Sequence, residues 1–247
     1  MEILASFGAL QIAVAVAATL GAAFIRGLTG FGFGILLVPI LALALTPVEA
    51  VLVLNIMAGL LSLSEIRYIL REAERSALTI GALVLVTTLP GLMLLDATPP
   101  ALARLLIALV ALSAFVAVLL PRRAGDQPGH LTTGLTGAAA GILTGFAAMP
   151  GPPVVPYYVG RDIPRRTAKA SMIAVFGVAA MAGVASGATL GVLEWRIVVL
   201  AVALFPLVML GNWLGSHAFG KVSERLWRIV VGVVLAAAAG TAFLKLL

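Results

Sequence analysis

The sequence predicts an all-α polytopic membrane protein that consists of two inverted-topology repeats. Three observations support this prediction: an apolar composition, charge-free segments about as long as a membrane span, and a duplicated helix break. Hydrophobic residues make up 62% of the 247 residues and charged residues only 11%, and the mean hydropathy is +1.17. A soluble domain has no place for so much apolar surface, and the long charge-free runs lack the alternation typical of barrel strands.

Charged residues divide the chain into apolar segments, most of which have the ~20 residues that a bilayer requires. The segments cover roughly residues 3–25, 27–45, 50–69, 76–95, 102–120, 131–160, 168–193, 197–216 and 227–247. The stretch from Gln127 to Gly160 carries no formal charge. It is too long for one span and too short for two, so we expect a hairpin or broken pair with its tip at residues 144–153.

The tetrapeptide Leu-Thr-Gly-Phe occurs twice, at residues 28–31 and 143–146. Glycines at 32 and 34 follow the first copy, and Pro150-Gly151-Pro152-Pro153 follows the second. Glycine loosens a helix and proline removes an amide donor, so we expect the backbone to unwind at both copies. Carbonyl and amide groups freed at membrane depth must be buried in protein or line a wet cavity.

The two copies indicate an internal repeat. They lie 115 residues apart, Pro47 and Pro164 lie 117 apart, and Arg75 and Arg196 lie 121 apart. The predicted organisation is an N-terminal transmembrane repeat over residues 1–121, a cytoplasmic linker over 122–130 and a C-terminal transmembrane repeat over 131–247. Each repeat is expected to hold a broken or re-entrant helix pair followed by three transmembrane helices.

The positions of the basic residues predict that the repeats are inverted. Residues 46–49 contain no Lys or Arg, whereas residues 161–169 contain four; residues 67–75 contain three, whereas residues 190–194 contain none. If basic loops face the cytoplasm, equivalent loops of the two halves lie on opposite sides of the membrane, with both termini outside. The alternative is that these charges carry no topological meaning.

Composition and motifs argue against several functions. The basic residues are scattered at segment ends, which disfavours a nucleic-acid partner, and the chain has no cysteine. His130 and His217 lack the spacing of metal ligands. We therefore expect no metal and no cofactor. No phosphate-binding loop, H-E-x-x-H motif or intramembrane aspartate pair occurs, so an enzyme lacks its parts.

Inverted repeats with one helix break per half are typical of secondary transporters, in which half-helix ends bind the substrate. A helix N-terminus carries partial positive charge and favours an anion. The glycines from Gly27 to Gly34, the second copy with its prolines at 150–153, and the two four-span halves resemble the TauE/SafE family of sulfite and organosulfonate exporters. The resemblance covers nearly the whole chain. It implies multi-pass insertion in the bacterial plasma membrane and export of anions such as sulfite or sulfoacetate.

Arg26 is the most informative candidate because it precedes the first break directly and has no counterpart at Gly141, the equivalent position. Its guanidinium is suited to bidentate binding of a sulfonate, although it can instead snorkel or satisfy backbone carbonyls. Threonine and asparagine in spans more often bond their own backbone or a neighbouring helix. The predicted substrate-binding residues are Arg26, Thr29, Gly30, Phe31, Gly32, Asn55, Thr144, Gly145, Phe146, Pro150, Gly151, Ser171 and Asn212.

No acidic residue is expected near the middle of a span, since Glu65 should pair with Arg67 at the interface. This disfavours coupling through an intramembrane carboxylate. At ~2.3 kcal/mol per charge per 100 mV, the membrane potential favours exit of a divalent anion by about 4.6 kcal/mol. The expected partners are a small anionic solute, the lipid bilayer and, as one option, further copies of the chain. An anion channel, a membrane-embedded enzyme and an assembly subunit are the alternatives.

Overall fold

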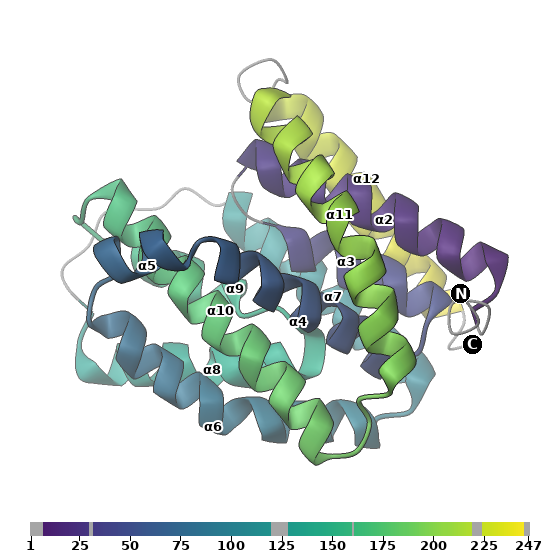
Figure 1. Cartoon of the computed structure of the whole chain (residues 1–247), viewed down its shortest axis with the longest axis horizontal. Coiled ribbons are helices and arrows are strands. Elements are labelled where there is room, and N and C mark those ends of the chain that lie inside the picture. Colours follow the sequence, from purple (N-terminus) through teal and green to yellow (C-terminus); the bar gives the residue numbers. More distant parts are fainter. Residues whose placement is uncertain (1–6, 30–31, 120–127, 160, 219–223, 245–247) are drawn as a thin grey trace.

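The computed structural model describes residues 7–29, 32–119, 128–159, 161–218 and 224–244, and every element within these ranges is an α-helix (Figure 1). The helices are α2 (Ala9–Thr29), α3 (Phe33–Ala44), α4 (Pro47–Ser64), α5 (Ile66–Glu72), α6 (Ser76–Ala97), α7 (Pro100–Leu119), α8 (His130–Ala147), α9 (Gly151–Val159), α10 (Arg165–Thr189), α11 (Trp195–Ala218) and α12 (Glu224–Leu244). Five of them, α2, α4, α6, α10 and α11, are long and apolar enough to cross a membrane. The prediction of a helical polytopic membrane protein is confirmed.

The helix order follows the predicted order in both halves. A pair of helices separated by a short break, α2 and α3, precedes α4, α6 and α7, and the pair α8 and α9 precedes α10, α11 and α12. The first half contains one further element, because the segment expected at 50–69 ends as a helix at Ser64 and continues as the seven-residue α5. Residues 122–127 of the predicted linker lie outside the described residues.

The helices α4 and α10 pack together in the middle of the molecule and run in opposite directions (Figure 1). At the start of α4, the carboxylate of Glu49 forms an ion pair with Arg196, which follows α10. Beyond its other end, the hydroxyl of Tyr68 donates to the carbonyl of Arg166 in the first turn of α10, at 2.8 Å. Each end of α4 therefore lies beside the opposite end of α10.

A capping box defines the start of α4. The Thr46 hydroxyl accepts from the Glu49 amide at 3.3 Å, and the Glu49 carboxylate accepts from the Thr46 amide at 2.7 Å. These two bonds satisfy amide groups that a helix leaves without partners in its first turn. Glu49 is thus placed by its own helix before it pairs with Arg196.

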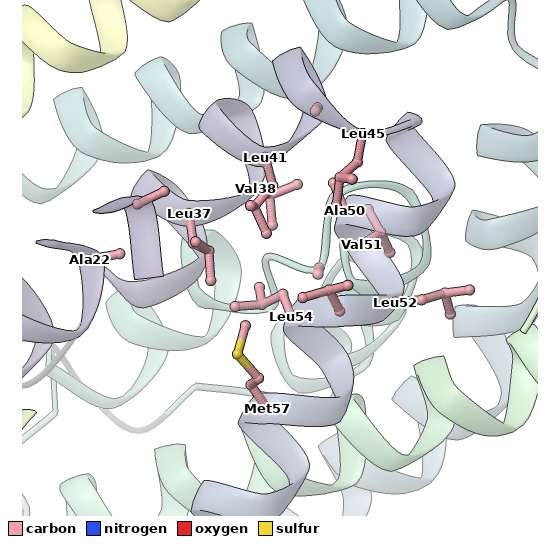
Figure 2. Packing of buried hydrophobic residues seen from close by; sticks show 14 of the residues in the cluster. Ala22, Leu37, Val38, Leu41, Leu45, Ala50, Val51, Leu52, Leu54 and Met57 are labelled. Carbon is pink, nitrogen blue, oxygen red and sulfur yellow. The ribbon is translucent and has the colours of Figure 1, made fainter. Parts of the chain in front are cut away.

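Apolar side chains of α3 and α4 form the centre of the core (Figure 2). Leu37 and Leu41 of α3 and Leu52 and Met57 of α4 are fully buried. On the outer helices large apolar side chains point away from the core; Leu78 of α6, for example, is 75% exposed. Such a surface is what lipid chains cover, as the composition predicts.

Glycines allow two helix pairs to approach closely. In the contact of α8 with α6, a Cβ on Gly137 would lie 2.8 Å from the Cβ of Leu83, and in the contact of α11 with α2, a Cβ on Gly211 would lie 2.7 Å from the carbonyl oxygen of Leu20. The glycine spacing every fourth residue predicts such contacts. Gly191 follows Gly183 and Gly187 at the same spacing but makes no such contact. It has φ 71° and ends α10 with a left-handed cap.

Candidate functional site

The first break is present at the predicted place. The helix α2 ends at Thr29, Gly32 adopts a left-handed conformation with φ 91°, and α3 begins at Phe33. With 12 residues, α3 is about 18 Å long and too short to cross a bilayer alone. Gly30, Phe31 and the side chain of Thr29 lie outside the described residues, so their predicted roles stay predictions.

The second break lies within the predicted tip at residues 144–153, but it is shorter than that stretch. Thr144, Gly145 and Phe146 belong to the last turn of α8, and the unwound residues are 148–150. The predicted break is therefore present, but the tetrapeptide 143–146 itself stays helical. Ala148 adopts the left-handed conformation with φ 51°, and its amide donates to the Thr144 carbonyl at 2.8 Å, so the end of α8 is capped by its own chain.

The prolines after the second break start a helix instead of preventing one. Pro152 and Pro153 lie in the first turn of α9, where a missing amide costs no hydrogen bond. Of the three prolines, only Pro150 lies in the unwound stretch. Gly151 is the first residue of α9. Only three residues lie between the two helices, so the break is shorter than expected.

Side chains from other helices bind the carbonyl groups at the end of α3. Arg104 of α7 donates from Nε to the carbonyl of Ala42 at 2.6 Å, and Gln11 of α2 donates from Nε2 to the carbonyl of Ala44 at 2.7 Å. These bonds satisfy carbonyls that a helix leaves free in its last turn. The short helix α3 thus ends inside the protein at an acceptable cost, as membrane-embedded backbone requires.

The two breaks meet inside the molecule. Gly34, in the first turn of α3, approaches the second break so closely that a Cβ there would lie 2.9 Å from the carbonyl oxygen of Ala148. The same Cβ would lie 2.9 Å from Cδ2 of Leu54 on α4. Phe33 and Met149 are buried at this place, which we call the break junction. Only glycine allows this approach of two backbones.

The break junction is buried among apolar side chains, and the N-terminal ends of both short helices lie near it. The first turn of α3 contacts Ala148 directly, and α9 begins three residues after Ala148, at Gly151. Two partial positive charges at helix N-termini are thereby brought to one region of low polarity. This arrangement favours a small anion.

Two predicted residues do not contribute side chains to the junction. The Thr144 hydroxyl donates to the carbonyl of Ala140 in its own helix, at 2.6 Å. The Ser171 hydroxyl accepts from the amide of Glu74 at 3.0 Å and joins α10 to the segment that follows α5. Both bonds correspond to the structural alternative for threonine and serine in spans.

Arg26 lies where α2, α11 and the end of α4 meet. Its Nη1 donates to Oδ1 of Asn212 at 2.9 Å, and its Nη2 lies 3.4 Å from Oε2 of Glu65. The expected pairing of Glu65 with Arg67 is therefore wrong, and Asn212 makes the interhelical bond that is common for asparagine in spans. A sequence does not show which carboxylate approaches Arg26, because the two residues come together only through packing.

Asn55 is a buried polar residue next in sequence to Leu54 of the break junction. It is 3% exposed, follows Leu54 directly and packs against Gly183 of α10. Its Nδ2 has no hydrogen-bond partner among the described residues. A buried amide donor without an acceptor is unfavourable, which makes Asn55 a candidate for a functional role.

Sequence reasoning missed an ion pair between Glu74 and Arg161, which joins the two halves. It lies at the end of α4 opposite to the Glu49–Arg196 pair. Tyr68 lies at the same end of α4 as this ion pair. Partial burial is the main cause that raises the pKa of Tyr68, and the nearby Glu72 carboxylate raises it further. Its hydroxyl therefore stays protonated and donates to Arg166. The only signal in the sequence for these two ion pairs was that Glu49 and Glu74 each stand at the boundary of an apolar segment.

The fold and the break junction define a polytopic α-helical membrane protein with two interrupted segments that meet in its interior. Residues 15–242 match the model of the family described as Sulfite exporter TauE/SafE, and the chain belongs to this family of membrane transporters. The match covers nearly the whole chain and confirms the resemblance found in the sequence. Comparisons with curated proteins and with solved structures gave no match.

Proposed function

We propose that the protein is a secondary transporter that exports small oxyanions, sulfite or an organosulfonate such as sulfoacetate, across the bacterial plasma membrane. The observation that carries this proposal is the break junction, where Gly34 of α3 meets Ala148 beside the start of α9. Half-helix N-termini that converge in an apolar interior are a binding arrangement for anions. Membership of the TauE/SafE family supports the same substrate class.

We further propose that residues 1–121 and 131–247 are inverted repeats. The antiparallel packing of α4 on α10 supports this, and so does the reciprocal packing of α2 on α11 and of α8 on α6. Pro39 in α3 and Pro156 in α9 lie 117 residues apart, the same spacing as Pro47 and Pro164. An inverted repeat explains both features, because each half then supplies the same elements in opposite orientation.

Close backbone contacts also follow the repeat. A Cβ on Gly27 of α2 would lie 2.9 Å from the amide nitrogen of Ser216 and overlap the carbonyl of Asn212; a Cβ on Gly91 of α6 would lie 2.9 Å from Cα of Ile142. Gly27 and Ile142 are 115 residues apart, and Gly91 and Asn212 are 121 apart, the offsets of the repeat. Equivalent positions thus form equivalent contacts in the two halves.

Alternating access around the break junction is the mechanism that we propose. Ion pairs between the halves lie at both ends of α4, Glu49–Arg196 at one end and Glu74–Arg161 at the other. Opening one pair while the other holds would expose the junction to one side of the membrane at a time. Arg26 and Asn55 are the proposed polar ligands, and Gly32, Pro150 and Gly151 are the proposed backbone ligands of the anion.

The test is a panel of anion fluxes in liposomes that contain the purified protein. Sulfite, sulfoacetate, taurine, sulfate and thiosulfate are compared at a fixed membrane potential, with protein-free liposomes as the control. We expect sulfite or sulfoacetate to be carried with a rate that saturates with concentration. A rate that rises in proportion to concentration would indicate an anion channel, and a rate equal to the control for every anion would contradict the proposed function.

A further inference from the structure

A cleft of about 260 Å³ runs between α8 and α9. Its lining includes Thr132, Thr136, Pro153, Pro156, Tyr157 and Arg161. Along α9 it extends from Pro153, two residues after the helix begins, to Arg161, two residues after the helix ends. It thus lies between the region of the second break and the basic segment 161–169.

Arg161 is the charged residue of this cleft, and its guanidinium is only partly used. One end, Nη1, forms the ion pair with Glu74, and the side chain is 8% exposed. The guanidinium carbon lies 5.3 Å from the centre of the Tyr157 ring, which supports it from one face. Its Nε is buried and has no hydrogen-bond partner within the part of the chain that the structure describes.

An unpartnered Nε in a buried guanidinium points to an acceptor that completes the site, since buried donors are normally bonded. Arg26 contrasts with it, because both terminal nitrogens of Arg26 already bind Asn212 and Glu65. In Arg161 the ion pair uses Nη1, whereas the side of the guanidinium that carries Nε is left for a second ligand. This side presents two parallel donors, a geometry that matches two oxygens of one oxyanion.

We propose that the cleft between α8 and α9 is an entry site for a small oxyanion, which binds the Nε side of Arg161. Hydroxyls of Thr132 and Thr136 line the same cleft and can donate to the remaining oxygen. Pro153 and Pro156 provide an apolar wall for the short carbon chain of an organosulfonate. This inference rests on the proposed function, because it assigns the entry step to a transporter of that substrate class.

Glu74 has a defined part in this site. Its carboxylate pairs with Nη1 of Arg161 and so fixes the orientation of the guanidinium, with the Nε side left for the anion. The exposed Arg165, Arg166 and Lys169 lie a few residues after Arg161 and raise the local anion concentration at the mouth of the cleft. The cleft ends at Pro153, three residues after Pro150 of the second break.

The test is equilibrium binding of sulfoacetate to the purified full-length protein in detergent, measured by calorimetry. Arg161→Lys keeps the charge and the pairing with Glu74 but removes the two-donor side, so we expect about tenfold weaker binding. Thr136→Val, which removes one hydroxyl at constant shape, should weaken binding severalfold. Arg165→Lys is the matched control at an exposed position and should bind as the wild type does. Thermal unfolding shows whether each variant is folded.

Unchanged sulfoacetate affinity in folded Arg161→Lys and Thr136→Val would overturn the proposal. A phosphatidylglycerol arm separates a dissolved anion from a lipid headgroup: if only the lipid depends on Arg161, the entry site for a soluble anion is wrong. The flux assay separates this inference from the proposed function. If binding depends on Arg161 but no anion is transported, the entry site is supported and the proposed transport function is contradicted. If anions are transported but binding does not depend on Arg161, the transport function is supported and the entry site is contradicted.

Discussion

The carboxylate of Glu49 is paired with the guanidinium of Arg196, so the start of α4 in the first half is tied to the start of α11 in the second. A second pair between the halves, Glu74 with Arg161, lies beyond the opposite end of α4. In each pair the carboxylate comes from the first half and the guanidinium from the second. The break junction lies between two electrostatic contacts that join the same two parts of the chain.

Removing Arg196 should cost more stability than neutralising Glu49. The Glu49 side chain is 9% exposed and that of Arg196 is 35% exposed. Arg196→Ala leaves a buried carboxylate without its partner, with an expected loss of about 2 kcal/mol in the free energy of unfolding. Glu49→Gln leaves an arginine that reaches water and keeps an oxygen for the capping box, so its loss should be smaller. Thermal unfolding in detergent measures both, and equal losses would contradict the burial argument.

Gly145→Ala should destabilise the contact of α8 with α6. A Cβ at this position would overlap the backbone of Thr88 and Leu92, and neither can move without shifting α6. We expect a loss of about 1–3 kcal/mol from overpacking. Gly134→Ala is the matched control in the same helix, where nothing lies near the Cβ position, and it should gain a few tenths of a kcal/mol from helix propensity. Denaturant or thermal unfolding of the two variants decides the comparison.

Single cysteines test the inverted repeat cleanly, because the native chain has none. Arg67→Cys and Glu194→Cys place exposed thiols near opposite ends of α4. We expect a membrane-impermeant maleimide to label them from opposite sides of sealed vesicles, with Arg67 on the cytoplasmic side. Labelling of both positions from one side would refute the inverted arrangement of the halves.

Asn55→Ala should separate transport from stability. If the free Nδ2 binds the anion, the substitution should lower the rate at subsaturating substrate about tenfold. The unfolding temperature should fall little, because no described hydrogen bond of Nδ2 is lost. Flux in liposomes and thermal unfolding are measured on the same preparation. A strongly lowered unfolding temperature with wild-type flux would show that Asn55 serves helix packing.

Arg26→Ala should reduce anion flux by at least about tenfold if the guanidinium binds substrate during transport. Arg26 also holds Asn212 and Glu65, so stability must be measured beside flux. Arg26→Lys keeps the charge but not the fork, and it should recover stability more fully than flux. Wild-type flux in Arg26→Ala would assign the residue to the packing of α2 on α11.

The helical membrane fold, the order of its elements and the existence of two breaks were predictable from the sequence, because they depend on local properties. Apolar length makes spans, and glycine and proline disturb helices wherever they stand. The exact place of the second break was not predictable. Whether Thr144 and Gly145 stay helical depends on the cap that Ala148 supplies and on the close contact of Gly145 with α6.

The sequence by itself determined which residue types reach the interior and that the tetrapeptide Leu-Thr-Gly-Phe occurs twice, since hydropathy and spacing are properties of one dimension. Only the tertiary structure decided that Arg26 pairs with Glu65, that Gly34 touches Ala148, and that the Nε of Arg161 has no partner. The physical reason is that polar pairing acts over a few ångströms in space. Residues 39 positions apart, such as Arg26 and Glu65, meet only after the apolar surfaces of their helices have packed.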